Sequence, residues 1–418
     1  MAVTLAPPLL RAIVCPDPAT WAAVGTDLRE LGFDPVTSPH RADTLVTAER
    51  LPEGFAEPLR ETLDRLGGSH QLLAGAPLGG LPVKELLQLT AEADHGEDEE
   101  DEGGDHGDMM AVTGDPSDDG LVMEDAEAVI GPLSGPLPAG LRLALTLDGD
   151  VVCGLELTTA LEGEGPLPDP FARRASEWAL ARDRANPTGG RVGGTHHLIA
   201  TELERALGHS LWLARLCELI GWAEAAEELS LAAGGLIEAH AAPLVEVGAA
   251  LSDGTVAELD GALKAFGESD AARRRMDGIA RVEASRCREL AITGPVARAS
   301  GLALDARSTD PAYGQLGFEP VLVTEGDAWA RARLRATEAR RALELADLAR
   351  EAGELPLGEG PVEGPRGRIA PHPSAGEAVA LQRGALAGLI EEAATGYELA
   401  RSLLAVASFD PSPWELGR

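Results

Sequence analysis

The sequence predicts an α+β protein with a small α/β domain at the N-terminus, then a β-hairpin and a long helical bundle. Between Leu10 and Pro82, short β-like runs alternate with helical ones, which is typical of a small α/β domain. Further along, Asp148-Gly149 separates two runs of alternating apolar and polar residues, which favours a hairpin. Most of the remaining sequence has helical periodicity. Aromatic residues make up only 3% of the chain, so we expect small aliphatic side chains to form the core.

The first predicted domain covers residues 1–85. Its expected elements are the β-like runs Ala12–Cys15, Thr44–Thr47 and Gln71–Ala74, and the helical runs Ala19–Leu31 and Glu53–Leu66. This βαβα order predicts a small open sheet.

Residues 86–120 are predicted to be a flexible acidic linker. The stretch from Ala91 to Asp119 is dominated by Glu, Asp and Gly, and has too few apolar side chains to form a core. It also contains possible metal ligands, namely His95, His106, Met109 and Met110. These side chains could capture a soft or divalent metal ion, although they have no fixed spacing.

The second predicted domain covers residues 121–418. It is expected to begin with a hairpin at Gly140–Thr158 whose two-residue turn is Asp148-Gly149. The expected helices cover about His196–Glu218, Trp222–Leu251, Val256–Leu290, Asp327–Ala352 and Gly376–Ala405.

Charge and cysteine usage restrict the class of protein. The net charge of -34 repels phosphate backbones, so we expect no nucleic-acid partner. The four cysteines, Cys15, Cys153, Cys217 and Cys287, form no CxxC pair, and we expect reduced thiols in a cytoplasmic protein. No run of about 20 apolar residues is available to span a bilayer, so we expect any membrane contact to be peripheral.

Several segments of the second domain carry a family pattern in the same order along the chain. They are LRLALTLDGDVVCGLELT at Leu141–Thr158, ELERALGHSLWL at Glu202–Leu213, GPVARASGLALDAR at Gly294–Arg307, TEGDAWARARLRATEAR at Thr324–Arg340, EGPRG at Glu363–Gly367 and SFDPSPWE at Ser408–Glu415. With these motifs, residues 121–418 resemble the large subunit shared by complex I and the nickel-iron hydrogenases. The resemblance implies a β-hairpin and helical bundle of that type.

The N-terminal part has a fainter resemblance. Arg41–Leu66, reading RADTLVTAERLPEGFAEPLRETLDRL, resembles part of the flavodoxin-like small subunit that partners this large subunit. That family holds an iron-sulfur cluster with several cysteines. This segment of the chain has only Cys15 nearby, in CPDPAT, so the resemblance implies a domain without the cluster.

The metal-binding positions of the resembled hydrogenases differ here. Their C-terminal motif SFDPCxxC supplies two thiolates to nickel and iron, where this chain has Ser412 and Glu415. A serine hydroxyl is not ionised near neutral pH and a carboxylate is a hard ligand, so we expect no nickel-iron centre.

The quinone site of complex I is also incomplete in this sequence. The resemblance implies a histidine-bearing loop after the hairpin and a tyrosine on the bundle. The hairpin instead runs into TTALEGEG at Thr158–Gly165, and neither Tyr313 nor Tyr397, the two tyrosines of the chain, falls at the matching position. We expect no cofactor bound by the chain's own cysteines, and a quinone is the one possible cofactor.

One helix face carries the candidates for a position beside a redox centre. Glu202, Arg205, His209 and Trp212 recur at spacings of three or four and share one face of the predicted helix. The resemblance implies that His209 could couple its proton to a neighbouring redox centre. The alternative is an ordinary interhelical hydrogen-bond network.

A second group of charged residues is predicted to form a structural ion-pair core that fixes how the helices cross. Its members are Arg298, Asp305, Arg307, Asp327, Arg331, Arg335 and Glu338.

Three hypotheses for function follow. In the first, the chain is a large-subunit-like component of a complex I-related assembly on the inner face of the cell membrane, with a cluster-bearing small subunit and antiporter-like membrane subunits as partners. In the second, it is a catalytically inactive paralogue that serves as an assembly or interaction module. In the third, the acidic linker handles metal for a neighbouring enzyme.

Overall fold

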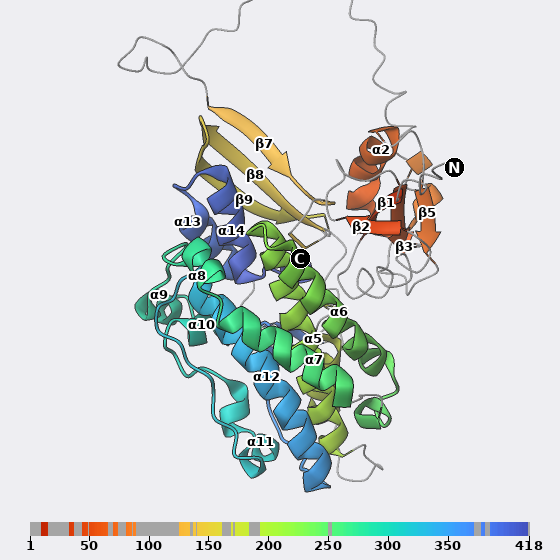
Figure 1. Ribbon diagram of the computed structural model, residues 1–418, viewed down its shortest axis with the longest axis vertical. Helices are drawn as coiled ribbons and strands as arrows, with labels where there is room; N and C mark the ends of the chain where they lie inside the picture. Colours follow the sequence, from red (N-terminus) through yellow and green to blue (C-terminus); the bar gives the residue numbers. More distant parts are fainter. Residues whose placement is uncertain are drawn as a thin grey trace, which may run out of the picture.

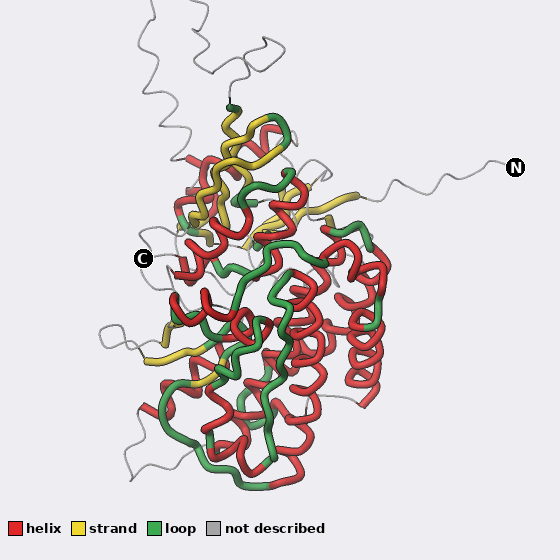
Figure 2. The backbone as a smooth tube through the Cα atoms, turned by 90° about the vertical axis from the view of Figure 1, so that its left-hand side faces the viewer, coloured by secondary structure: helices red, strands yellow, loops and turns green. Residues whose placement is uncertain are grey.

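The computed structural model describes residues 10–15, 33–36, 44–48, 50–65, 70–73, 81–85, 87–88, 125–133, 137–138, 140–160, 169, 172–183, 193–249, 253–371, 378–380 and 385–416. They form an α+β structure with a parallel sheet, a separate antiparallel sheet and a helical bundle (Figure 1). Figure 2 shows most strands at one end and the long helices at the other. The predicted helix Ala19–Leu31 and the linker residues His95, His106, Met109 and Met110 lie outside the described residues.

The N-terminal module is a parallel sheet of strand order β2-β1-β3-β5. Its strands are β1 (Leu10–Cys15), β2 (Phe33–Val36), β3 (Thr44–Ala48) and β5 (His70–Leu73). The three predicted β-like runs are therefore confirmed, and β2 is an addition. The predicted helical run Glu53–Leu66 is also confirmed, as a short 3-10 turn η2 (Glu53–Phe55) followed by helix α2 (Ala56–Arg65).

The predicted hairpin is confirmed as β8 (Leu141–Asp148) and β9 (Val151–Thr159). The two residues between the strands are Gly149 and Asp150, so the turn lies one residue later than predicted. Gly149 has φ 63°, a conformation that glycine adopts without steric cost, and this fixes the turn position. A third strand, β7 (Ala126–Ile130), pairs with β8 and was not predicted, since it lies next to the acidic stretch.

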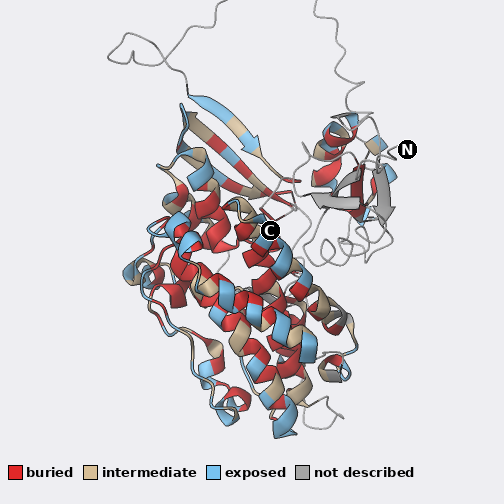
Figure 3. Ribbon diagram, viewed as in Figure 1, coloured by how far each residue is buried: buried red, intermediate tan, exposed pale blue. Residues whose placement is uncertain are grey.

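Two long helices form the centre of the bundle, α5 (Gly194–Leu219) and α12 (Ala328–Ala352). They pack against each other and confirm two of the predicted helices. Asp327 ends the preceding loop and caps α12, because its carboxylate accepts a hydrogen bond from Ala330 N. Helices α6 (Ala223–Ala241) and α7 (Asp253–Gly267) complete this layer, and Figure 3 shows the buried residues along the inner helix faces.

The other three predicted helices are too long. The helix expected at Trp222–Leu251 ends at Ala241, because Pro243 has no backbone N–H to donate within a helix, and a 3-10 turn η4 (Val247–Ala249) follows. The helix expected at Val256–Leu290 is divided into α7, α8 (Asp270–Met276) and α9 (Ala284–Glu289).

Two local features explain the remaining breaks. Ala280, with φ 47°, and Gly278, with φ 75°, have left-handed backbone conformations between α8 and α9, which a helix cannot contain. The prediction of one helix at Gly376–Ala405 is wrong in its first part, which contains strand β12 (Ala378–Ala380). The second part holds α13 (Ala385–Ala394) and the start of α14 (Leu399–Phe409), separated by Gly396 with φ 88°.

Several short elements that periodicity did not predict connect the long helices. They are α4 (Arg173–Asp183), α10 (Gly294–Ala299), η5 (Ala306–Thr309), α11 (Pro311–Gln315), β10 (Val362–Glu363), β11 (Arg368–Pro371) and α15 (Pro413–Leu416). Strands β10, β11 and β12 form a small antiparallel sheet around the EGPRG segment. In the described part of the chain, no helix has an apolar stretch long enough to cross a bilayer.

The N-terminal module contacts the hairpin sheet through closely packed backbone. Arg142 of β8 donates from Nη2 to the Gly54 carbonyl oxygen at 3.1 Å. A Cβ atom at Gly54 would lie 2.2 Å from the Ala160 carbonyl oxygen, so only glycine fits at this position. The following residue, Phe55, is 1% exposed. The two parts of the chain therefore share a specific contact.

Because of this contact, Gly54→Ala is expected to destabilise the protein by about 1–3 kcal/mol, the usual cost of overpacking. The measurement is the free energy of unfolding in urea. Gly261→Ala is the matched control, because Gly261 is a helical glycine of α7 with no atom within 4 Å of an added Cβ. That control is expected to gain up to about 1 kcal/mol from helix propensity. Equal stability of both variants would contradict the packing described here.

Candidate functional site

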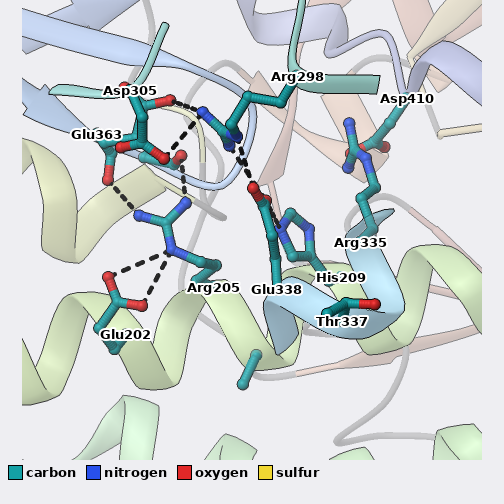
Figure 4. A network of polar contacts seen from close by, with 12 residues as sticks. Glu202, Arg205, His209, Arg298, Asp305, Arg335, Thr337, Glu338, Glu363 and Asp410 are labelled. Carbon is teal, nitrogen blue, oxygen red and sulfur yellow. Dashed lines mark hydrogen bonds and ion pairs between the residues drawn. The ribbon is translucent and has the colours of Figure 1, made fainter. Parts of the chain in front are cut away.

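Glu338 of α12 lies at the centre of a buried network of charged side chains between α5 and α12 (Figure 4). Arg298, at the end of α10, donates to both oxygens of this carboxylate, from Nε to Oε1 at 2.5 Å and from Nη2 to Oε2 at 3.1 Å. His209 Nε2 of α5 lies 3.2 Å from Glu338 Oε2. One carboxylate thus connects three elements that are distant in the sequence.

The network continues through carboxylates on the other side of Arg298. Its Nη1 atom contacts Glu363 Oε1 at 2.7 Å and Asp305 Oδ2 at 3.2 Å. Asp305 also binds Arg307, with 2.7 Å between Arg307 Nη2 and Asp305 Oδ2. Arg307 Nη1 then lies 3.2 Å from Glu202 Oε2 on α5. These contacts therefore form a continuous path from Glu338 on α12 to Glu202 on α5.

Glu202 and Arg205 close the network on α5. Arg205 Nε is 3.2 Å from Glu202 Oε2, and its two terminal nitrogens donate to the carbonyl oxygens of Gly364 and Glu363 at 2.8 and 2.6 Å. The Tyr313 hydroxyl donates to Glu202 Oε1 at 2.5 Å. Glu202, Arg205 and His209 therefore share a helix face, as their spacing predicted, and they belong to one polar network, which is the alternative given above for these residues.

Burial and neighbouring charges determine the protonation of this network. Burial lowers the pKa of His209 to about 3, despite the opposing effect of the hydrogen bond that the ring donates to Glu338, so the ring is neutral near pH 7. Burial alone would raise the pKa of Glu338, but Arg298 and the His209 hydrogen bond hold it well below its usual value. Burial, followed by the repulsion of Asp305, raises the pKa of Glu363. The centre therefore holds fixed ion pairs around a neutral histidine.

Two members of the predicted ion-pair core have other contacts. Asp327 caps α12 and accepts a hydrogen bond from Gly278 N at 2.8 Å. Arg331 donates to Ser408 Oγ at 2.7 Å and to the Ala280 carbonyl oxygen at 3.0 Å, and its guanidinium lies 3.9 Å from the centre of the Phe409 ring. These contacts are a helix cap and hydrogen bonds to neutral oxygens, so the ion-pair prediction does not describe them.

Arg335 belongs to a second cluster, beside the first, whose centre is Asp410. Arg335 Nη1 is 2.7 Å from Asp410 Oδ2, and the Arg335 guanidinium lies 4.5 Å from the centre of the Trp212 ring. The indole Nε1 of Trp212 donates to the Ala407 carbonyl oxygen at 2.8 Å. Trp212 therefore orients the second cluster, although it shares a helix face with His209 in the first.

Sequence reasoning missed several members of the two clusters. They are Glu363, Tyr313, Arg215, Arg366 and Asp410. Three of these residues lie within the EGPRG and SFDPSPWE motifs, which could have identified them as charged partners. Arg215 and Tyr313 have no such signal, because their partners are distant in the sequence.

At the positions where the resembled hydrogenases have two C-terminal thiolates, this chain has Ser412 and Glu415. Ser412 is 2% exposed, and its Oγ has no hydrogen-bond partner among the described residues. Glu415 lies in α15, and its side chain is outside the described part. Burial raises the pKa of the Cys217 thiol to about 12 and also raises that of Cys287, so both thiols are protonated near pH 7. A hydroxyl and protonated thiols are poor ligands for these metals.

Both tyrosine hydroxyls have internal hydrogen bonds. Tyr313 donates to Glu202, as described above, and the Tyr397 oxygen accepts from Ala280 N at 3.1 Å. Each hydroxyl therefore has a structural role in fixing its helix or loop.

Comparison with known proteins identifies relatives of this chain. A family model described as the respiratory-chain NADH dehydrogenase 49 Kd subunit matches residues 229–400. The carbon monoxide-induced hydrogenase of Rhodospirillum rubrum is 38% identical over 109 residues, which cover 25% of this chain and 28% of that protein. A subunit of the NADH-quinone oxidoreductase of Salinispora arenicola is 38% identical over 77 residues, or 18% of each chain. The chain thus matches less than a third of the length of these relatives.

A solved structure extends the similarity in fold. A chain of the membrane-bound sulfane sulfur reductase, an archaeal respiratory membrane complex, aligns with a TM-score of 0.57 at 18% identity. The alignment covers 71% of this chain and 99% of that one. Together, these findings confirm the resemblance predicted from the motifs of the second domain.

The network makes a prediction for stability. Arg298→Met is expected to lower the free energy of unfolding by about 3–5 kcal/mol, because three buried carboxylates lose a cation. Urea denaturation monitored by circular dichroism measures this change. The control is Arg333→Met, which removes a surface pair with Glu325 and should cost under about 1 kcal/mol. A similar small loss in both variants would show that the buried pair is not essential.

The neutral state of His209 predicts that the stability of the folded protein depends on pH. Its pKa is about 3 in the folded protein and 6.5 ordinarily, so below pH 6.5 the unfolded chain gains a proton that the folded chain does not. Stability should therefore fall as the pH decreases from 6.5, by up to about 1.4 kcal/mol per pH unit for this residue. His209→Gln should have a shallower slope between pH 6.5 and about 5, where Glu338 does not yet titrate.

A second variant for comparison in this pH experiment is His197→Gln. Burial lowers the pKa of His197 to about 4, so this residue contributes to the same loss and its removal should also reduce the slope. The double variant should then have the shallowest slope of the set. An unchanged slope in His209→Gln would mean that this ring is charged in the folded protein.

Proposed function

We propose that this chain, which resembles the 49-kDa-type large subunit, is a large-subunit-like component of a complex I-related respiratory assembly. Its role there would be electron transfer or structural coupling, without a nickel-iron centre of its own. The names of its relatives support this class, since they include a carbon monoxide-induced hydrogenase and subunits of NADH-quinone oxidoreductases.

The buried network is the observation that carries this proposal. Replacing buried ion pairs with well-packed apolar residues is often neutral or stabilising, so such a network is not needed for stability alone. In this chain it connects Glu202, Arg298 and Glu338 through residues that are at most 4% exposed. A rigid centre that holds the positions of α5 and α12 is what a subunit needs when it presents a fixed surface to partners.

No metal chemistry is assigned to this chain in its proposed role. Ser412 supplies a neutral hydroxyl where the resembled hydrogenases have a thiolate. A quinone is the one cofactor consistent with this role, and it would be contacted by groups other than the two tyrosine hydroxyls, which already have internal partners. His209 would act as a neutral hydrogen-bonding group beside a redox centre of the partner subunit.

The proposed partners are a cluster-bearing small subunit and antiporter-like membrane subunits, with the chain on the cytoplasmic face of the membrane. The N-terminal module would be a flavodoxin-like domain related to the small subunit. Its parallel strands in the order β2-β1-β3-β5 support this origin, since flavodoxin-like sheets begin with the order 2-1-3.

A specific contact favours the alternative, a catalytically inactive paralogue that serves as an assembly or interaction module. The N-terminal module packs on its own hairpin sheet through Gly54 and Ala160. A small-subunit-like domain held in this way could replace a separate partner. The metal-handling role of the acidic linker has no comparable support, because its His and Met residues lie outside the described part.

Affinity purification of the tagged full chain from detergent-extracted membranes tests the proposal. The expected result is co-purification with membrane subunits and an iron-sulfur protein, with iron but no stoichiometric nickel, and with quinone measured in the same sample. A strain that carries the tag alone is the control. Recovery of the chain without partners, iron or quinone would contradict the proposal and favour the interaction module.

A further inference from the structure

The first cluster, which is the buried network around Glu338, has one more carboxylate than arginine among the described residues. Its carboxylates are Glu202, Asp305, Glu338 and Glu363, and its arginines are Arg205, Arg298 and Arg307. His209 is neutral near pH 7, and burial raises the pKa of Tyr313, so neither ring adds a charge. With every carboxylate ionised, the cluster would hold one negative charge that no cation balances, which is costly in a protein interior.

Other arginines around Glu363 do not supply the missing cation. Three of them, on α4, α12 and the EGPRG segment, pair with aspartates outside the first cluster. They are Arg182 with Asp310, Arg335 with Asp410, and Arg366 with Asp169 and Asp410. Arg368 lies opposite Glu363 in the pairing of β10 with β11, but its partly exposed side chain forms no ion pair with any described residue. The excess of one carboxylate therefore remains within the first cluster.

The four carboxylates of the cluster are not equally compensated. Within the described part of the chain, each of the other three has two arginines at 3.8 Å or less. Glu363 has one, Arg298, whose Nη1 lies 2.7 Å from Glu363 Oε1. The second oxygen of Glu363 accepts a hydrogen bond from the neutral backbone nitrogen of Ala306 at 3.0 Å. Glu363 is therefore the carboxylate that loses the fewest ion pairs when it binds a proton.

Asp305 makes ionisation of Glu363 still less favourable. Arg298 Nη1 contacts both carboxylates, at 3.2 Å from Asp305 Oδ2 and 2.7 Å from Glu363 Oε1, and Figure 4 shows both residues on the same side of Arg298. Two like charges at one nitrogen repel each other, which favours a proton on one of them. Burial and this repulsion raise the pKa of Glu363, whereas Arg307 and Arg298 lower the pKa of Asp305 despite its burial. The direction of both shifts agrees with the geometry.

We propose that the first cluster is a proton-binding site in which Glu363 holds one exchangeable proton. With this proton bound, three carboxylates face three arginines, and the buried charge is balanced. Its release leaves a negative charge on Glu363 beside that of Asp305. Because Glu363 contacts one arginine, its proton affinity depends on the position of Arg298. The site is formed by this chain alone and does not depend on the respiratory assembly proposed above.

Infrared spectroscopy of the full-length protein tests for this proton, because the C=O stretch of a neutral carboxylic acid is separate from the carboxylate bands. At about pH 6.5, a glutamate with the ordinary pKa of 4.5 is almost fully ionised. The parent chain should still have a neutral-acid band there, which decreases as the pH is raised and which Glu363→Gln lacks. Glu325→Gln is the control, since Glu325 pairs with Arg333 on the surface, and it should keep the band. Absence of the band from the parent, or an equal band in Glu363→Gln, would overturn the proposal.

Melting temperatures of the same variants give a second, independent readout. Near pH 6.5, Glu363→Gln should melt close to the parent, because glutamine resembles the protonated acid, whereas Glu338→Gln removes an ionised carboxylate from two arginines and should melt several degrees lower. Above pH 4.5 the folded parent keeps a proton that its unfolded chain has lost, so its stability from this group falls as the pH rises. Glu363→Gln should therefore gain in melting temperature relative to the parent with increasing pH. An equally large loss in Glu363→Gln and Glu338→Gln at every pH would show that Glu363 is an ionised partner of Arg298, against the proposal.

Discussion

The two hydrogen bonds between Arg298 and Glu338 fix the centre of this protein. They join the end of α10 to the middle of α12, and His209 connects the same carboxylate to α5. Such a pair is stable in a dry interior only when every remaining donor and acceptor also has a partner. Glu363, Asp305 and Arg307 satisfy this condition, so the positions of β10 and η5 follow from the position of Glu338.

Arginine also has a packing role in this core. Among the described residues, the five largest side chains that are under 2% exposed are Trp178 and four arginines, namely Arg205, Arg298, Arg331 and Arg335. In a chain with 3% aromatic residues, their stems and planar guanidinium groups fill volume that aromatic rings fill in other proteins. Arg331 on Phe409 and Arg335 on Trp212 show this use directly. Charge and packing are therefore properties of the same side chains here.

The sequence predicted those parts of the fold that depend on local pattern. Helices α5 and α12 follow from their periodicity, and the shared face of Glu202, Arg205 and His209 follows from spacing alone. The helix breaks could not be predicted in the same way. Ala280 is a good helix former by type, yet it has a left-handed backbone conformation because tertiary contacts, including the one from Arg331 to its carbonyl oxygen, fix it there.

The charged sites were predicted only in part, because the contacts within them are also tertiary rather than local. Motifs identified Arg298, Arg307 and Glu338 as members of one core, although no local rule states which carboxylate each arginine contacts. The division into two clusters was not predictable, because Arg335 is separated from Asp410 by 75 residues. Ser412 was predicted as a lost ligand. That its hydroxyl is buried without a hydrogen-bond partner among the described residues required the three-dimensional structure.

The long sequence separations in these clusters affect the order in which the chain can fold during synthesis. Arg205 contacts backbone oxygens 158 and 159 residues further along, and Arg215 contacts Asp410 across 195 residues. When α5 leaves the ribosome, the partners of its arginines have not yet been made. Helix α5 therefore cannot become buried at a low energetic cost until Glu363, Gly364 and Asp410 have been made. The nascent protein must keep this helix hydrated or bound by a chaperone until then, so completion of the core is a late event relative to the synthesis of α5.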